Sequence, residues 1–182
     1  MHNPASSSGQ PTAAYSKKIC LLGDFAVGKT SLVRKFVYAL FDDKYISTIG
    51  VKVSRKTVAV ISHGGVAELT MMLWDLAGSE NFDQIRASYL RGSAGAILVC
   101  DLTRPETLAH LRVYVQDLRR QIADPQLILA ANKVDLKDEQ RISEADITAL
   151  AAELGTPLIF TSAKTGQGVE EIFRTLGSML IK

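Results

Sequence analysis

The chain has little of several features that would place it in a specialised class. It has only two cysteines, each inside a short apolar run, so we expect buried thiols in a reducing compartment rather than a disulfide framework. No stretch reaches the ~18 uninterrupted apolar residues of a membrane span, and the N-terminus lacks the apolar segment of a secretory signal. A Met-Gly start and a cysteine near the C-terminus are both missing, so neither myristoylation nor prenylation is expected. We expect a cytoplasmic protein without a lipid anchor of its own.

The chain also has little excess of charge of either sign. Lys and Arg number 21 against 19 Asp and Glu, with no long basic or acidic block, so nucleic acid is not an expected partner. Hydrophobic residues make up 47% of the 182 residues, which is enough for one domain with a full core. Residues 1–16 hold almost nothing to bury and are predicted to be a disordered tail. The folded domain is predicted to span residues 17–182.

Six short apolar runs alternate with amphipathic helical patterns. The runs are residues 19–22, 51–61, 66–74, 96–100, 127–131 and 158–160. Only a turn at 63–65 separates the second and third, which indicates a hairpin, and the apolar phase slips between Val53 and Val58, which indicates a bulge. Ser143 and Gly155 have the spacing of the N-cap and the stop of one helix. The pattern predicts an α/β fold, a three-layer sandwich with a mostly parallel six-stranded sheet, one antiparallel edge strand and helices on both faces.

A phosphate-binding loop follows the first apolar run. Residues 23–30 read GDFAVGKT and fit the pattern G-x-x-x-x-G-K-[ST] between a strand and a helix. Its glycines allow successive N–H groups to face an anion, and the following helix adds its positive end. Lys29 is expected to reach the β- and γ-phosphates, and the Thr30 hydroxyl is expected to ligate Mg²⁺. The expected fold is therefore a P-loop NTPase sandwich.

A second loop indicates which base is bound. Asn132-Lys133-Val134-Asp135 follows the fifth apolar run directly. The Asp135 carboxylate can accept from the adjacent N1–H and 2-amino groups of guanine, whereas adenine would present a lone pair there. Asn132 can bind the other edge of the ring and the Lys133 stem can cover its face. Thr161-Ser162-Ala163-Lys164 follows the last run, where a backbone N–H is within reach of the guanine carbonyl oxygen. The predicted ligand is GTP or GDP.

With these motifs in hand, the chain resembles the Ras superfamily of small GTPases, and most nearly its Rab branch. The resemblance covers residues 17–182 and rests on GDFAVGKT, YISTIGV, WDLAG, NKVD and TSAK in the family's order. It implies a molecular switch, expected to be monomeric, that hydrolyses GTP. Segments 42–51 and 76–90 would respond to the γ-phosphate, and effectors, exchange factors and activating proteins would bind residues 42–53 and 76–90.

The resemblance also assigns roles to matching positions. The implied Mg²⁺ ligands are Thr30, Thr48 and, through water, Asp75. The residues implied in catalysis are Lys29, Thr48, Gly78 and Ser79. The implied nucleotide-binding residues are Asp24, Phe25, Ala26, Val27, Gly28, Lys29, Thr30, Ser31, Phe41, Tyr45, Thr48, Gly78, Asn132, Lys133, Asp135, Ser162, Ala163 and Lys164.

The chain departs from the family at positions that matter for hydrolysis. Ser79 follows the D-x-A-G motif where relatives have the glutamine that orients the attacking water, and a serine hydroxyl is too short for that task. We predict slow hydrolysis and a poor response to activating proteins that need the glutamine. Alternatively, Glu80 or Asn81 places the water. Phe25 replaces a small residue of the loop and either obstructs an arginine supplied by an activating partner or points outward.

Partner binding is expected to be atypical as well. Val53 stands where an aromatic residue is usual in the Rab effector surface, although Trp74 and Tyr89 match the other two members. Membrane recruitment through a partner remains an alternative to a purely cytoplasmic protein. Two rival functions stay open, a GTP-binding interaction module with negligible hydrolysis and an ATP-using phosphotransferase. The histidines show no metal-ligand spacing, and no role is assigned to His110.

Overall fold

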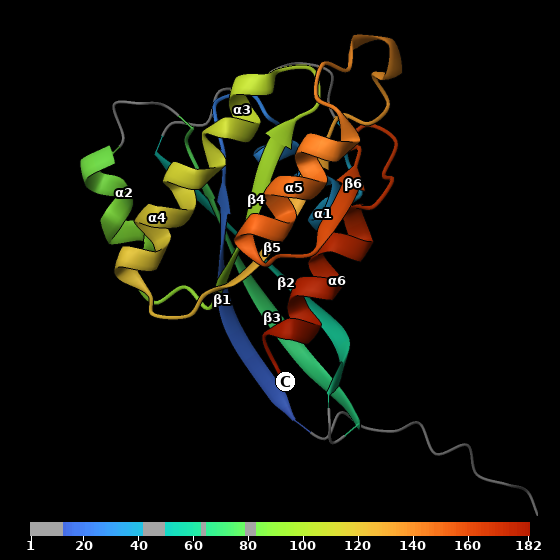
Figure 1. Ribbon diagram of the computed structural model, residues 1–182. Coiled ribbons are helices and arrows are strands. Elements are labelled where there is room, and N and C mark those ends of the chain that lie inside the picture. Colours follow the sequence, from blue (N-terminus) through green and yellow to red (C-terminus); the bar gives the residue numbers. More distant parts are fainter. Residues whose placement is uncertain (1–12, 42–49, 63–64, 79–82) are drawn as a thin grey trace, which may run out of the picture.

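The computed structural model describes residues 13–41, 50–62, 65–78 and 83–182, which form one six-stranded sheet covered by helices (Figure 1). The strand order is β2-β3-β1-β4-β5-β6. All neighbouring pairs are parallel except β2 and β3, which pair antiparallel at the edge. The strands are β1 (Ala14–Leu22), β2 (Val51–Ser62), β3 (Gly65–Leu76), β4 (Gly95–Asp101), β5 (Gln126–Asn132) and β6 (Leu158–Thr161). The predicted sheet is confirmed.

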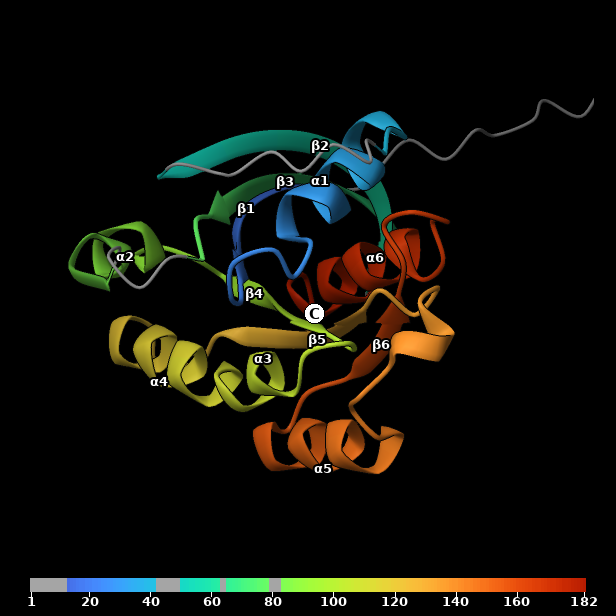
Figure 2. The same cartoon turned by 90° about the horizontal axis from the view of Figure 1, so that it is seen from above.

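Helices cover both faces of the sheet. The helical elements are α1 (Lys29–Tyr38), α2 (Asp83–Leu90), α3 (Pro105–Ala109), α4 (Leu111–Gln121), the 3-10 turn η2 (Lys137–Glu139), α5 (Glu144–Leu154) and α6 (Val169–Met179). Seen from above, α1 and α6 lie on one face of the sheet, and α3, α4 and α5 lie on the other (Figure 2). The predicted three-layer arrangement is therefore confirmed.

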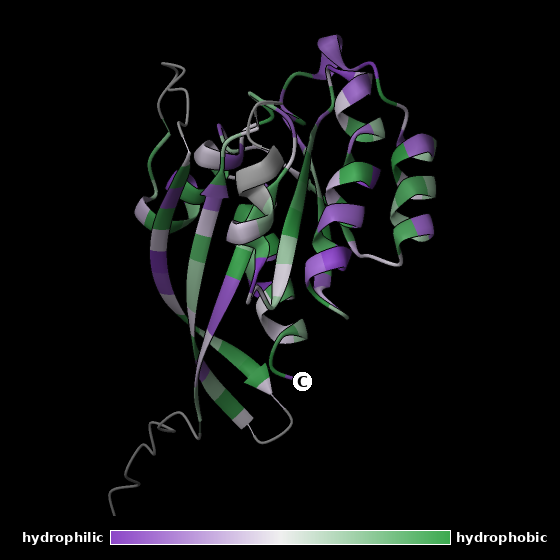
Figure 3. Cartoon of the chain, turned by 90° about the vertical axis from the view of Figure 1, so that its left-hand side faces the viewer, coloured by the Kyte–Doolittle hydropathy of each residue, from purple (hydrophilic) through white to green (hydrophobic). Residues whose placement is uncertain are grey.

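The two interfaces between the sheet and its helices are two separate hydrophobic clusters. Phe36 of α1 stacks on Phe173 of α6 with ring centroids 4.0 Å apart in the first cluster. The second cluster joins β4 and β5 to α4 and α5, with Leu98 and Leu118 fully buried. Every residue of β4 is buried, as expected for a central parallel strand with helices on both sides. The helices carry polar and apolar bands in alternation (Figure 3), because each packs one stripe against the sheet.

The hairpin of β2 and β3 corrects one prediction. Its pairing runs without interruption from Val51 opposite Leu76 to Ser62 opposite Gly65, so the predicted bulge is absent. The apolar phase slips for another reason, since Ser54 occupies the buried face and Val53 is left 44% exposed on the open one. Residues 63–64 of the predicted turn lie outside the described residues.

Strand β1 starts inside the segment assigned to the tail. Ala14 already pairs with Glu68 of β3, whereas residues 1–12 lie outside the described residues. The predicted ends of α5 are confirmed, because Ser143 Oγ accepts a hydrogen bond from Asp146 N at 3.1 Å and Gly155 adopts the left-handed φ of 66°. Within the described part of the chain, no helix has both the length and the apolar character needed to cross a bilayer.

Candidate nucleotide-binding site

The candidate residues gather where the parallel strands end. The carboxyl ends of β1, β4, β5 and β6 share one edge of the sheet, and the loops that follow them hold both predicted binding motifs. Open α/β sheets bind their ligands in the crevice outside this edge. The topology therefore brings together loops that are about a hundred residues apart in sequence, as the contact between Asn132 and Val27 illustrates.

The phosphate loop needs its glycines for space as well as for backbone conformation. Gly28 is the N-cap of α1 with φ 107°, and a Cβ there would lie 2.2 Å from Asn132 Nδ2. At Gly23, with φ 149°, a Cβ would lie 2.2 Å from the Val99 carbonyl oxygen. Both positions thus combine a left-handed backbone with a contact too close for any side chain.

The ammonium of Lys29 is held over this loop. Its Nζ donates hydrogen bonds of 2.7 Å to the carbonyl oxygens of Gly23 and Asp24. Burial lowers the pKa of Lys29 to about 8, while the charges of Asp75 and Asp24 act in the opposite direction. A buried cation gains from a nearby anion, so this position suits the binding of a phosphate group.

Thr30 and Asp75 provide oxygen ligands suited to Mg²⁺. Thr30 Oγ1 donates to Asp75 Oδ2 at 2.5 Å, and Asp75, near the end of β3, is 1% exposed. The described residues contain no cluster of three or more His, Cys, Asp or Glu side chains that could hold a metal by themselves. Mg²⁺ typically takes one or two carboxylates and completes its shell with water and phosphate oxygens. This pair fits that pattern, whereas the third candidate ligand, Thr48, lies outside the described residues.

Gly78 packs against the backbone of the phosphate loop. A Cβ at Gly78 would lie 2.4 Å from both Asp24 C and Phe25 N. Only glycine permits this approach, which brings the start of the predicted second switch to the site. The following residue, Ser79, and Tyr45 of the first switch lie outside the described residues.

The base-reading loop is joined to its neighbours by side-chain hydrogen bonds. Asn132 Nδ2 donates to the Val27 carbonyl oxygen at 2.9 Å, and Asn132 Oδ1 accepts from Thr161 Oγ1 at 3.1 Å. Asp135 Oδ1 accepts from Ser162 Oγ at 2.6 Å. The two motifs predicted to read guanine are therefore in direct contact with each other, and Asn132 also contacts the phosphate loop.

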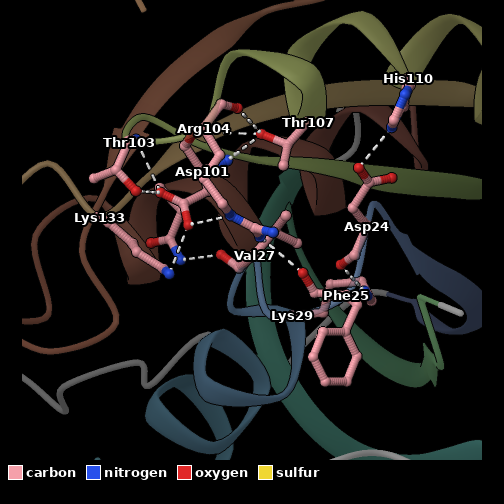
Figure 4. A network of polar contacts seen from close by, with 11 residues as sticks. Asp24, Phe25, Val27, Lys29, Asp101, Thr103, Arg104, Thr107, His110 and Lys133 are labelled. Carbon is pink, nitrogen blue, oxygen red and sulfur yellow. Dashed lines mark hydrogen bonds and ion pairs between the residues drawn. The ribbon is translucent and has the colours of Figure 1, made fainter. Parts of the chain in front are cut away.

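The remaining predicted residues differ in their surroundings. Ser162 Oγ also accepts from Thr165 N at 3.1 Å, which shapes the loop after β6. Ala163 is buried at 5% exposure and Lys164 is exposed. Phe41 is 36% exposed, at the last residue described before the first switch, and Phe25 is 46% exposed. The Phe25 ring points away from Asp101 and Arg104 (Figure 4).

Several polar residues of the site were not identified from the sequence. His110 Nδ1 and Asp24 Oδ2 are 2.7 Å apart (Figure 4). Tyr114 donates its hydroxyl to Asp24 Oδ1 at 3.1 Å, so the start of α4 contacts the phosphate loop. Asp101 and Arg104 link the end of β4 to both predicted motifs. Asp101 had a usable signal, because it is a charged residue that ends a fully apolar run. His110 had none, since its partner is distant in sequence.

Comparison with known proteins assigns the chain to a protein family. The sequence profile of the Ras family matches residues 18–182, which is nearly all of the described domain. The chain belongs to the Ras family. It is 32% identical to the Ras-related protein Rab-21 of Geodia cydonium over 100% of this chain and 78% of that protein. It is 35% identical to the Ras-related protein Rab-21 of Canis lupus familiaris and to that of Homo sapiens, in each case over 93% of this chain and 74% of the relative.

Membership settles the class of activity. Ras-family proteins of the Rab type are small GTPases that bind guanine nucleotides, so this chain is a GTP hydrolase and a Rab-like member of the superfamily. The resemblance stated from its five motifs is confirmed. The roles of individual residues stay predictions, since the comparisons concern whole chains.

Proposed function

We propose that the chain is a Mg²⁺-dependent switch that alternates between GTP and GDP and hydrolyses GTP slowly. The G domain comprises residues 17–182 together with the start of β1, which begins at Ala14 within the segment expected to be a tail. The single observation that supports guanine-nucleotide binding best is the hydrogen bond of 2.9 Å from Asn132 to the Val27 carbonyl oxygen, because it joins the base-reading loop to the phosphate loop. One ligand with a base at one end and phosphates at the other fits this arrangement.

Each end of the ligand has its own residues in this proposal. The backbone N–H groups of residues 24–30 and the Lys29 ammonium bind the phosphates, and the positive end of α1 adds to their attraction. Asp135 accepts from guanine and is oriented by the Ser162 hydroxyl. Thr30 and Asp75, with Thr48, would hold Mg²⁺, which supplies positive charge to the β- and γ-phosphates when bound.

Slow hydrolysis follows from Ser79. Catalysis of phosphoryl transfer depends on positioning the attacking water and stabilising charge, and Ser79 lacks the length and the amide group of glutamine. With the positioning step weakened, the switch would stay in its GTP form until a partner or nucleotide exchange intervenes.

Single-turnover hydrolysis tests the slow rate. The protein is loaded with GTP, Mg²⁺ starts the reaction, and phosphate release is compared for wild type, Ser79→Gln and the control Ser178→Gln on α6. Ser79→Gln is expected to hydrolyse GTP roughly 10-fold faster, as a positioned hydrogen-bonding group gains about 1.4 kcal/mol in the transition state. A wild type as fast as Ser79→Gln would contradict the proposal and direct attention to Glu80 and Asn81.

The second candidate function is a GTP-binding interaction module with negligible hydrolysis, which Ser79 also favours. It predicts that neither wild type nor Ser79→Gln releases phosphate while GTP and GDP still exchange. An ATP-using phosphotransferase is disfavoured by Asp135, and displacement of bound GDP by ATP would contradict guanine selectivity.

Partner proteins would bind residues 42–53 and 76–90. Tyr89, within the second range, has its ring centroid 6.1 Å from that of Trp74, and Val53, within the first, pairs with Trp74 across the hairpin. A valine offers less rigid surface than the aromatic residue usual there, so standard Rab effectors are expected to bind weakly. We place the protein in the cytoplasm as a monomer, with recruitment to membranes through a partner.

A further inference from the structure

Asp101 is a buried carboxylate between the two binding loops. It is the last residue of β4 and 1% exposed. Its Oδ1 accepts from Thr103 N at 2.9 Å and from Thr103 Oγ1 at 2.7 Å, and its Oδ2 lies 2.6 Å from Lys133 Nζ and 3.1 Å from Arg104 Nε. Burial alone raises the pKa of Asp101, but the hydrogen bonds from Lys133 and Thr103 outweigh it and hold the pKa below its usual value. The carboxylate is therefore ionised and fully occupied by donors.

Arg104 continues this contact to the phosphate loop. While its Nε faces Asp101, its Nη2 donates to the Phe25 carbonyl oxygen at 2.7 Å (Figure 4). A guanidinium can make both contacts at once because its donors are fixed in a planar fork, which an ammonium cannot reproduce. Arg104 thus spans the distance between the buried carboxylate and the loop backbone.

The turn that presents Arg104 is itself fixed. Thr107 is fully buried, accepts from Asp101 N at 3.0 Å and donates to the Arg104 carbonyl oxygen at 2.7 Å. On the other side, Lys133 has a left-handed φ of 68°, a backbone conformation that residues with a side chain rarely adopt. Its ammonium pairs with Asp101 at 2.6 Å. Arg104 is therefore held by contacts of its guanidinium and of its backbone carbonyl.

We propose that Asp101 and Arg104 brace the base-reading loop against the phosphate loop. The brace makes the two loops release a bound guanine nucleotide in one concerted step. Both are positioning residues, and the inference rests on the proposed binding of guanine nucleotide at this site. The brace runs from Lys133 through Asp101 and Arg104 to Phe25. It acts in parallel with the direct bond from Asn132 to Val27. Loss of the brace lets the phosphate loop open while guanine is still recognised by Asp135.

The test is the dissociation rate of a fluorescent GDP analogue from the full chain with Mg²⁺, followed after addition of excess GDP. Arg104→Ala is expected to release the analogue about 10-fold faster, the usual effect of losing a charge-assisted hydrogen bond. Arg104→Lys is expected to stay close to Arg104→Ala because one ammonium cannot bridge both acceptors. The control is Arg112→Ala, which removes an exposed arginine paired with Glu153 and is expected to keep the wild-type rate.

A double-mutant comparison identifies the brace as one unit. Asp101→Asn is expected to release the analogue at least as fast as Arg104→Ala, and the double variant about as fast as Asp101→Asn alone. The phosphorus NMR spectrum of bound GDP should show a displaced β-phosphate resonance in Arg104→Ala but not in Arg112→Ala. This signal reports the loop around the phosphates, and a purely structural role for Arg104 would leave it in place.

The outcomes separate this inference from the proposed function. Wild-type release rates in Arg104→Ala, full rescue by Arg104→Lys, or additive effects in the double variant would each overturn the brace while leaving GDP binding intact. Failure of wild type to bind the GDP analogue would overturn the proposed function, and the brace with it. Because Arg104 has a side chain 34% exposed, its variants are expected to fold even if Asp101→Asn does not.

Discussion

The base half and the phosphate half of the site are held together in different ways. In the base half, each key side chain contacts a side chain from another strand end, with Asn132 bound by Thr161, Asp135 by Ser162 and Lys133 by Asp101. In the phosphate half, Lys29 donates to backbone carbonyl oxygens of its own loop, whereas Thr30 donates to the side chain of Asp75 near the end of β3.

The difference teaches which half is positioned by the buried sheet. The base half uses the carboxyl ends of β4, β5 and β6, whose positions the buried sheet fixes, so little ordering is needed on binding. In the phosphate half, Lys29 contacts backbone carbonyls of its own loop, which follows the end of β1. We therefore expect recognition of the base to depend mainly on the chemistry of the side chains that contact it. Binding of the phosphates and the metal should depend more on the phosphate groups and on Mg²⁺ themselves.

The largest effect is expected from changing Asp135, the carboxylate that reads the base. Asp135→Asn is expected to weaken GDP binding roughly 100-fold or more, because an amide N–H would face the donors of guanine in a desolvated site. Isothermal titration with GDP measures the loss, and xanthosine diphosphate, with an acceptor at that edge, should bind the variant better than GDP. Asp138→Asn, an exposed acid in the same loop, is the matched control. Equal GDP affinity in Asp135→Asn and wild type would remove Asp135 from the base site.

A change in the phosphate half should have a smaller effect that more Mg²⁺ can correct. Asp75→Asn is expected to raise the Mg²⁺ concentration needed to retain GDP by about 10-fold, within the usual range for a residue that acts on a metal through water. The measurement is GDP release at stepped free Mg²⁺, with Thr30→Ser expected to behave like wild type because it keeps the hydroxyl. If Mg²⁺ dependence is the same in Asp75→Asn and wild type, the assigned metal site is wrong.

The smallest expected effect concerns the two cysteines, which lie in the strands of the sheet below the two halves of the site. Cys20 in β1 and Cys100 in β4 are both fully buried, and burial raises the pKa of Cys20 and, with the Asp101 charge, raises the pKa of Cys100 to about 12. Because a raised thiol pKa means that the protonated form persists at pH 8, we expect both to resist alkylation in the folded protein. Cys100 should react more slowly than Cys20, which mass spectrometry after timed iodoacetamide treatment can measure. The opposite order would indicate that the base half opens more readily.

Much of the fold was predictable because buried strands leave a strong signal. A central parallel strand such as β4 must be apolar on both faces, and helices must carry an apolar stripe, so the layers follow from the pattern. The same signal misled at the hairpin. The side chain of Val53 lies on the open face and Ser54 on the buried one, which imitates a bulge although the register is regular.

The candidate site was predictable only where the chemistry is local. The loop at 23–30 and the motif at 132–135 each concentrate their chemistry within a few residues, and each follows a strand. His110 and Tyr114 act on Asp24 from α4, and Arg104 acts on Phe25 across 79 positions. No periodicity or spacing in the sequence reports such contacts, because they depend on where the crossover helix lies on the sheet.

The sequence by itself therefore determined the kind of protein, a Ras-family GTPase with a phosphate loop and a guanine motif in a parallel α/β sheet. These features are contiguous, and their physical requirements restrict residue types directly. Only the tertiary structure decided how the motifs are joined. Gly28 must be glycine because Asn132 lies against it, and Asp101 gains its place between Lys133 and Arg104 only when β4 and β5 pair. A side chain's partners are set by the packing of strands and helices, which no single stretch of sequence contains.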